Sequence, residues 1–357
     1  MLRHYKGLLG EFDYHDDVFK VDTMNRKDVL RYIGNDRAVS LPKGCINTRY
    51  MFAGCELPEG FSLHESFDTS DVVDMTGMFC NCNLPEGFSL GPNFNTDNVV
   101  DMTDMFEHCY AHTTLSLGPN FNTSKVEDLS GMFSNATFNS GLVLGDNFDT
   151  SSVRSMSGMF HNSNLGDSFS LGDKFNTSRV EDFAAMFSAF RFPNNFKFPS
   201  CFTTKNALNL GSMFSGAEFP EDYCLDVDCK IKKDYKMLGV FDNCGFPKGF
   251  TIGSQFSVEK RVKSEDIFYD CYLNGDELRK LLPFEYARDV ANYLKDSYRN
   301  KCYMIANNHY VCRDDLAKHL SQALNVSKNS VCDAINLFAQ KYSDEDSNTE
   351  SEGMNLF

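Results

Sequence analysis

The sequence predicts an α/β repeat solenoid, with one short strand and one short helix in each coil, followed by a small all-α C-terminal domain. The first reason is the dipeptide Met-Phe, which recurs every 27 residues from Met51-Phe52 to Met213-Phe214. A second Phe keeps the same interval from Phe67 onward, and an apolar position does so from Leu63 onward. Periods of this length indicate stacked coils. The last reason is a change to helical spacing after Cys271.

The segment 1–44 precedes the repeats and is expected to form an N-terminal β cap. It lacks the repeat pattern, and the segments Leu8–Tyr14 and Val18–Val21 are typical of two strands. These two segments predict a hairpin. A cap is required because the open end of a coil stack exposes unpaired backbone groups.

Residues 45–273 are predicted to form nine repeat units, and the second unit is typical. Phe88-Ser89-Leu90 alternates apolar and polar residues, which predicts a short strand with Phe88 and Leu90 directed inward. The segment Val99–Phe106 then places apolar residues at i, i+3, i+6 and i+7, which predicts a short helix. One unit cannot bury its apolar face alone, so neighbouring units must stack.

Residues 274–342 are predicted to form the all-α domain, because apolar residues recur there at helical spacing. The segment 316–335 is similar to a helix-turn-helix, in which Lys328, Asn329 and Ser330 would lie on the DNA-reading helix. A helical bundle that docks a protein partner accounts for the same pattern. Residues 343–357 are interpreted as a solvated acidic tail.

The charge of the chain argues against two classes of protein. It has 34 Lys and Arg against 50 Asp and Glu, a formal net charge of −16. General nucleic-acid binders and binders of anionic membranes need a basic surface. The chain has no apolar run of the ~20 residues that a membrane span requires, and its N-terminus lacks a signal-peptide core. We therefore expect a protein of the cytoplasm of a bacterial cell or its host.

One repeat position carries a carboxylate in several units. It is occupied by Asp74, Asp101, Asp128 and Asp182, with Ser155 as the interruption. We hypothesise that the repeats from Asp74 to Asp182 present an acidic surface to a basic protein partner. The residues of that surface are Asp74, Glu86, Asp97, Asp101, Asp104, Glu107, Asp128 and Asp182. Two alternatives are that each Asp interacts with a helix N-terminus and that the charge serves solubility alone.

A second candidate surface is the outward row of the predicted strands, which would line the concave side of the solenoid. Small side chains there would leave a smooth surface for a partner. The row consists of Ser62, Ser89, Ser116, Val143, Ser170 and Lys197.

Catalytic motifs are absent from the sequence. It contains no phosphate-binding loop, nucleophile elbow or zinc-protease motif. A group of thiols and imidazoles from Cys80 to His112 has the ligand types of a zinc site. However, Cys82 and Cys109 share their repeat position with Ala136 and Ser163, which indicates a buried slot for small residues. We therefore expect no enzyme, no metal and no cofactor.

The repeats also resemble a known family. The run Phe-Asp-Thr-Ser-Ser-Val-Arg-Ser-Met-Ser-Gly-Met-Phe at Phe148–Phe160 is similar to the repeats of BspA-like leucine-rich-repeat proteins, including the mycoplasma surface type. The resemblance extends over residues 45–273. It implies a right-handed, leucine-rich-repeat-like solenoid that binds other macromolecules, often in secreted or lipid-anchored proteins.

Together these observations predict a non-enzymatic, protein-binding solenoid. We expect an intracellular inhibitor or effector whose acidic repeats occupy a basic, nucleic-acid-handling protein, as an anti-defence protein of a phage or mobile element would. Direct nucleic-acid binding and membrane binding do not fit the charge. Two alternatives stay open: a DNA-binding regulator that uses the C-terminal helix-turn-helix, and a surface adhesin of the BspA-like type.

Overall fold

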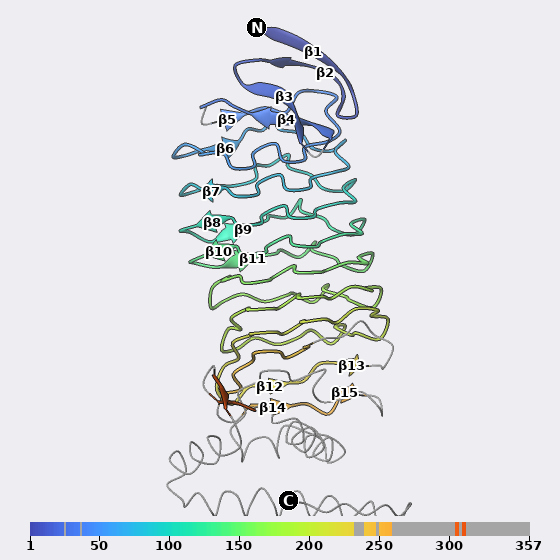
Figure 1. Ribbon diagram of the computed structural model, residues 1–357. Coiled ribbons are helices and arrows are strands. Elements are labelled where there is room, and N and C mark those ends of the chain that lie inside the picture. The colour runs from blue at the N-terminus through green and yellow to red at the C-terminus, as the bar shows by residue number, and fades with distance from the viewer. Residues whose placement is uncertain are drawn as a thin grey trace, which may run out of the picture.

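The computed structural model of the chain describes residues 1–24, 26–35, 38–231, 239–247, 250–258, 304–306 and 309–311. Its strands are β1 (Leu2–Gly7), β2 (Gly10–His15), β3 (Phe19–Met24), β4 (Lys27–Tyr32), β5 (Ala38–Val39), β6 (Ser62–Leu63), β7 (Asn83–Leu84), β8 (Tyr110–Ala111), β9 (Leu115–Ser116), β10 (Thr137–Phe138), β11 (Leu142–Val143), β12 (Cys224–Leu225), β13 (Lys230–Ile231), β14 (Thr251–Ile252), β15 (Ser257–Val258), β16 (Met304–Ala306) and β17 (His309–Val311). Figure 1 shows successive coils stacked like rungs between β1–β4 at one end and β12–β15 at the other.

The N-terminal strands form two antiparallel hairpins. β1 pairs with β2 from Leu2↔His15 to Gly7↔Gly10, and β3 pairs with β4. The expected hairpin between Leu8–Tyr14 and Val18–Val21 is therefore wrong in its pairing, because the two segments belong to different hairpins. The reason is the two-residue turn Leu8-Leu9, which joins β1 to β2.

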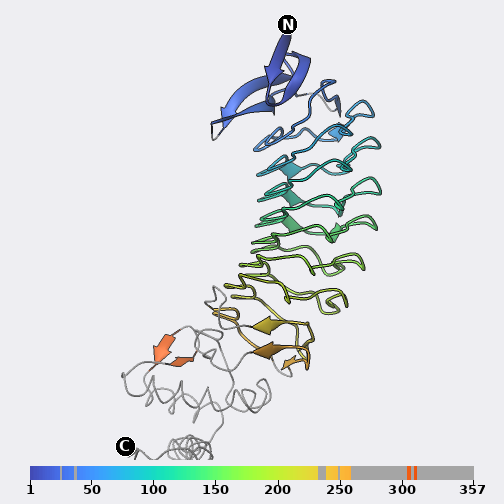
Figure 2. The same ribbon diagram turned by 90° about the vertical axis from the view of Figure 1, so that its right-hand side faces the viewer.

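The turn of the first hairpin lies directly on the backbone of the first coil. The Ile46 N–H donates to the Leu9 carbonyl at 2.9 Å. Gly10 has a φ of 114°, and a Cβ at this position would collide with the Gly44 carbonyl oxygen. Glycine is thus required for this close approach. Figure 2 shows both hairpins at the end of the stack.

The coils contain no helix within the described residues, so the expected α/β solenoid is wrong. In the second unit, Asp104 has a φ of 56° and His108 has a φ of 54°, whereas an α-helix needs a φ near −60°. The same two positions have positive φ throughout the stack. At the first position they are Tyr50, Gly77, Asp104, Gly131, Gly158, Ala185, Ser212 and Gly239.

Chained turns replace the expected helix. The Met78 N–H donates to the Met75 carbonyl at 3.1 Å, and the Cys82 N–H donates to the Phe79 carbonyl at 3.2 Å. The third residue of each turn is the one with positive φ, as in type II turns. Apolar residues three apart are the first and last residues of such turns, so their spacing is shared by a helix and a chain of turns. The spacing alone could not distinguish the two.

The remaining amides of the same segment join neighbouring coils. Met75, Gly77 and Phe79 donate to the carbonyls of Asp101, Thr103 and Met105 at 3.0, 2.8 and 2.9 Å. Parallel pairs such as β9–β11, with Leu142 opposite Leu115, join the coils on another side. The expected strand at residues 88–90 is not formed, although Leu90 is buried.

Two columns of Phe rings fill the core. In the first column, Phe52, Phe79 and Phe106 stack with ring centroids 5.2 and 5.4 Å apart and their planes within 5°. The column continues through Phe133, Phe160, Phe187, Phe214 and Phe241. The second column contains Phe94, Phe121, Phe148, Phe175 and Phe202. The recurrent Met-Phe motif is thus a core motif.

A buried column of Thr hydroxyls lies beside the rings. The Thr123 Oγ1–H donates to the Asp149 carbonyl at 2.8 Å, and the Thr150 Oγ1–H donates to the Asn176 carbonyl at 2.8 Å. Both Thr residues are 0% exposed. Each hydroxyl therefore satisfies a polar group of the next coil inside the core.

The predicted C-terminal all-α domain is wrong where the structure describes it. β16 and β17 lie within residues 274–342 and pair antiparallel from Met304↔Val311 to Ala306↔His309. The remaining residues of 274–342 and the predicted tail 343–357 lie outside the described residues.

Removal of one hydroxyl from the Thr column should loosen the stack locally. We expect Thr123→Val to lower the free energy of unfolding by about 1–3 kcal/mol, because it leaves the part-buried Asp149 carbonyl without its donor. The urea midpoint, followed by circular dichroism, measures the change. Thr123→Ser is the matched control, since it keeps the hydroxyl. Equal midpoints for wild type and Thr123→Val would contradict this account of the column.

Candidate protein-binding surface

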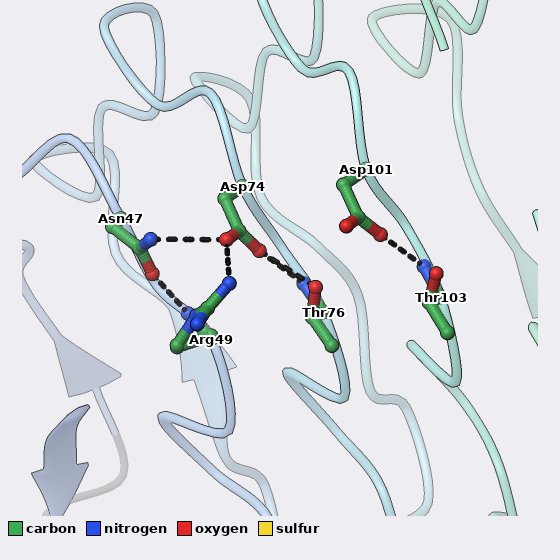
Figure 3. Close-up of polar contacts among 6 residues, drawn as sticks. All are labelled: Asn47, Arg49, Asp74, Thr76, Asp101 and Thr103. Atoms are coloured by element: carbon green, nitrogen blue, oxygen red, sulfur yellow. Dashed lines mark hydrogen bonds and ion pairs between the residues drawn. The ribbon is translucent and has the colours of Figure 1, made fainter. Parts of the chain in front are cut away.

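The row of Asp residues begins with a neutralised member. Figure 3 shows Asn47 and Arg49 of the preceding coil in contact with Asp74. The Asn47 amide donates to Asp74 at 3.1 Å, and the Arg49 guanidinium forms an ion pair with the same carboxylate oxygen. The side chains of Arg49 and Asp74 are only 12% and 14% exposed. This pairing removes Asp74 from the acidic surface that the sequence predicts.

The other Asp residues of the row hold a turn. Asp101 accepts the Thr103 N–H at 3.0 Å, and Asp128 accepts the Ser130 N–H at 2.8 Å. Asp182 accepts the Ala184 N–H in the same way. The expected contact with helix N-termini is wrong, because the coils contain no helix within the described residues; the partner is the amide two residues later.

Asparagine side chains accept the same turn amide in this row. The side-chain oxygen of Asn47 accepts the Arg49 N–H at 3.0 Å, and that of Asn209 accepts the Gly211 N–H at 3.0 Å. The Ser155 side chain has no carbonyl oxygen, and its hydroxyl forms a hydrogen bond with that of Ser130 at 2.6 Å. The turn therefore needs no negative charge at this position.

Three carboxylates lie around a fourth, half-buried one, Asp104. Burial is the largest cause that raises the pKa of Asp104 to about 6, and the nearby charges of Glu107, Asp128 and Asp101 contribute to the same shift. None of Asp101, Asp104 and Asp128 forms an ion pair within the described residues. We name Asp101, Asp104, Glu107 and Asp128 the carboxylate cluster.

The aromatic ring of Tyr50 lies on the same side of the coils. A Cβ on Gly77 would collide with this ring. Burial raises the pKa of Tyr50, and the charge of Asp104 contributes. The cluster is therefore bordered by an aromatic side chain and by the Cys80 thiol, which donates to Glu107 at 3.5 Å.

The remaining predicted acidic residues lie outside the cluster. Asp97 accepts hydrogen bonds from Asn95 and Asn122 at 3.3 and 2.7 Å. Glu86 is exposed, and Asp182 lies two coils beyond Asp128, after Ser155. Of the eight acidic residues predicted for the surface, four form the cluster.

The predicted strand row is accessible along the stack. Ser62 lies in β6 and is half-buried, whereas the following members of the row are exposed: Ser89, Ser116, Val143, Ser170 and Lys197. Ser116 and Val143 lie opposite each other in β9 and β11. The row carries one positive charge, at Lys197, and no carboxylate.

The cysteine slot is buried and hydrogen-bonded. The thiols of Cys82 and Cys109 donate to the carbonyls of Phe52 and Phe79, each at 2.8 Å. Burial raises the pKa of Cys82 to about 12. No group of three or more His, Cys, Asp or Glu side chains with the arrangement of a metal site occurs in the part of the chain that the structure describes.

Sequence reasoning missed Arg49, which occupies the position of Thr76 and Thr103 in later coils. A base two residues after the Asn of the row was the signal that could have revealed the pair. The predicted DNA-reading residues Lys328, Asn329 and Ser330 lie outside the described residues. None of the described residues forms a helix able to cross a membrane.

Replacing Asp104 by Asn should stabilise the fold in a pH-dependent way. The folded-state pKa of Asp104 is raised from its ordinary value of 3.8 to about 6, so ionisation destabilises the fold above that pH. We expect Asp104→Asn to gain about 1–2 kcal/mol at pH 8, after allowance for solvent screening, and nothing below pH 4. Urea midpoints of both proteins at the two pH values measure the difference. Asn also tolerates positive φ.

Glu59→Gln is the matched control, because Glu59 is exposed. A gain for Asp104→Asn that is equal at both pH values would assign the effect to the backbone preference of Asn and contradict the electrostatic explanation.

The comparisons with known proteins identify a family. Its model matches the chain twice, over residues 46–162 and 110–224, which together span half of the sequence. No curated protein and no solved structure matches the chain. The resemblance to BspA-like repeats of the mycoplasma surface type is confirmed at the level of this family. The chain belongs to the family described as Mycoplasma protein of unknown function, DUF285.

Proposed function

We propose that this protein is a non-enzymatic binding protein whose carboxylate cluster occupies a basic surface of a partner protein. A nucleic-acid-handling protein is the partner that fits best, since such proteins carry positive fields over large surfaces. The protein acts in the cytoplasm of a bacterial cell or its host as an inhibitor or effector, as an anti-defence protein of a phage or mobile element would.

The choice of Asp over Asn carries this proposal. Asn47 and Asn209 hold the same turn that Asp101 and Asp128 hold. The fold therefore does not require the two charges. A function outside the fold gives a reason for them, and attraction of a basic partner is such a function.

The magnitude of the repulsion also supports the proposal. Carboxylates on neighbouring coils, ~4.8 Å apart, repel each other by about 0.9 kcal/mol even at the dielectric constant of water. The raised pKa of Asp104 indicates that burial and repulsion disfavour its ionised form in the free protein. Lys or Arg side chains of a partner would relieve both, so part of the binding free energy comes from relief of this repulsion.

A surface adhesin is the second candidate, and membership of the family favours it. An adhesin would present the same cluster outside the cell. Fractionation of the source cell, followed by protease treatment of intact cells, separates the two candidates. Recovery with the cytoplasm favours the inhibitor, whereas degradation on intact cells favours the adhesin.

Neutralising the cluster should weaken capture of the partner. We expect the full chain carrying Asp101→Asn, Glu107→Gln and Asp128→Asn to retain about tenfold less of a basic protein from a nuclease-treated lysate of the source cell. The fold should be preserved, because Asn keeps the turn at the first and third positions. Quantitative mass spectrometry of the bound fraction measures the loss.

The matched control removes the same charge elsewhere, through Glu59→Gln, Glu65→Gln and Asp167→Asn at exposed positions. Equal capture by both variants would sink the proposal. Capture that disappears with nuclease would instead favour the DNA-binding regulator.

A further inference from the structure

The exposed apolar side chains of the coils fall in one row. Between residues 45 and 231, the large hydrophobic residues that are exposed are Ile46, Val73, Val100, Val143 and Leu208. Four of these five share a repeat position, and Val143 alone does not. Apolar residues scattered singly on a surface need no explanation, but consecutive coils with the same exposed residue type do. We name Ile46, Val73 and Val100 the apolar stripe; they are 39%, 40% and 46% exposed.

The stripe is continuous through its backbone. The Val73 N–H donates to the Ile46 carbonyl at 2.9 Å, and the Val100 N–H donates to the Val73 carbonyl at 3.0 Å. Hydrogen-bonded neighbours of this kind place their side chains ~4.8 Å apart on one face. The next members of the row are Glu127, Arg154 and Glu181, of which Arg154 pairs with Glu181 at 3.0 Å. The stripe is thus followed by Glu127, which forms no ion pair within the part of the chain that the structure describes.

Carboxylates lie close to the stripe in the chain. Val73 is followed by Asp74, which is paired with Arg49, and Val100 is followed by Asp101 of the carboxylate cluster. Asp71, two residues before Val73, is exposed. The nearby Lys125 donates to the Asn98 side chain at 2.8 Å. Negative charge thus prevails around the apolar side chains, which suits a partner that combines apolar and basic residues.

The spacing of the stripe selects the conformation of such a partner. A helix laid along the stack presents one side chain per turn of ~5.4 Å, and the coils repeat at ~4.8 Å. Over two steps the mismatch is ~1 Å. An extended strand places side chains of one face ~6.8 Å apart, a mismatch of ~4 Å over two steps. A helix therefore matches all three positions, and a strand does not.

We propose that the apolar stripe binds an amphipathic basic helix of the partner protein, with its apolar side chains on Ile46, Val73 and Val100 and its Lys or Arg side chains on the flanking carboxylates. This inference rests on the proposed function and names the part of the partner that is recognised. Helices of this type dock through apolar residues at i, i+3 or i+4, and i+7.

The test uses the full chain and a fluorescent amphipathic Leu/Lys peptide of about four helical turns, titrated by fluorescence anisotropy. We expect the variant Ile46→Thr, Val73→Thr and Val100→Thr to bind the peptide at least about tenfold more weakly. Thr is also β-branched, so the backbone is preserved. The matched control is Val143→Thr with Leu208→Thr, which removes exposed apolar residues outside the stripe and should bind like wild type.

Two results would overturn the inference. One is binding by the triple Thr variant within about twofold of wild type, and the other is equal binding of a scrambled peptide of the same composition. If the charge-neutralised variant also fails to lose binding, the proposed function fails; if only the Thr variant retains binding, the proposed function stands without the stripe. Sedimentation velocity measures the oligomeric state of the protein alone. A dimer that is lost in the triple Thr variant would also overturn the inference, because a second copy of the chain would then cover the stripe.

Discussion

The structure depends on how the backbone amides of each coil divide their hydrogen bonds. In the turn segment, one set of amides closes turns within the coil, as Met78 does on Met75, and the alternate set donates to the next coil, as Gly77 does on Thr103. This division requires positive φ at two positions of each coil. A coil without its neighbour would leave half of these amides unpaired, so the coils are stable only as a stack.

The same constraint turns each repeat position into a row. Because the register between coils is fixed by the backbone, side chains at one position lie ~4.8 Å apart along the stack. In the core, this register produces the Phe columns and the Thr column. On the surface, it places the exposed residues of one repeat position in a continuous row. A single departure, such as Arg49 in place of Thr, changes the surface at one coil without altering the fold. The exposed surface is therefore made of rows, and it differs from coil to coil only where a row changes its residue type.

Much of this could be predicted from the sequence. The interval of Met78-Phe79 and Met105-Phe106 identified stacking, and Cys82 and Cys109 were correctly assigned to a buried slot. The helix was wrong because a spacing of three fits turns and helices alike; Gly77 and Asn81, residues that tolerate positive φ, were the signal against it. The shared repeat position predicted that Asp101 and Asp128 lie close together. The ion pair of Arg49 with Asp74 was missed, because its signal in the sequence is a single base at a position that holds Thr in the next two coils.

The fold and the proposed function make opposite demands on the Asp row. The turn accepts Asn as readily as Asp, and Asn would remove the repulsion that raises the pKa of Asp104. Near the N-terminal end, Arg49 neutralises Asp74, and beyond Asp128 the row passes to Ser155, so Asp101 and Asp128 are left as uncompensated charges on two neighbouring coils. These coils adjoin the apolar stripe, whose last member, Val100, immediately precedes Asp101. The carboxylates lower the stability of the fold, and the apolar side chains beside them are exposed to water. A binding site has both features, because one partner can neutralise the charge and cover the apolar area.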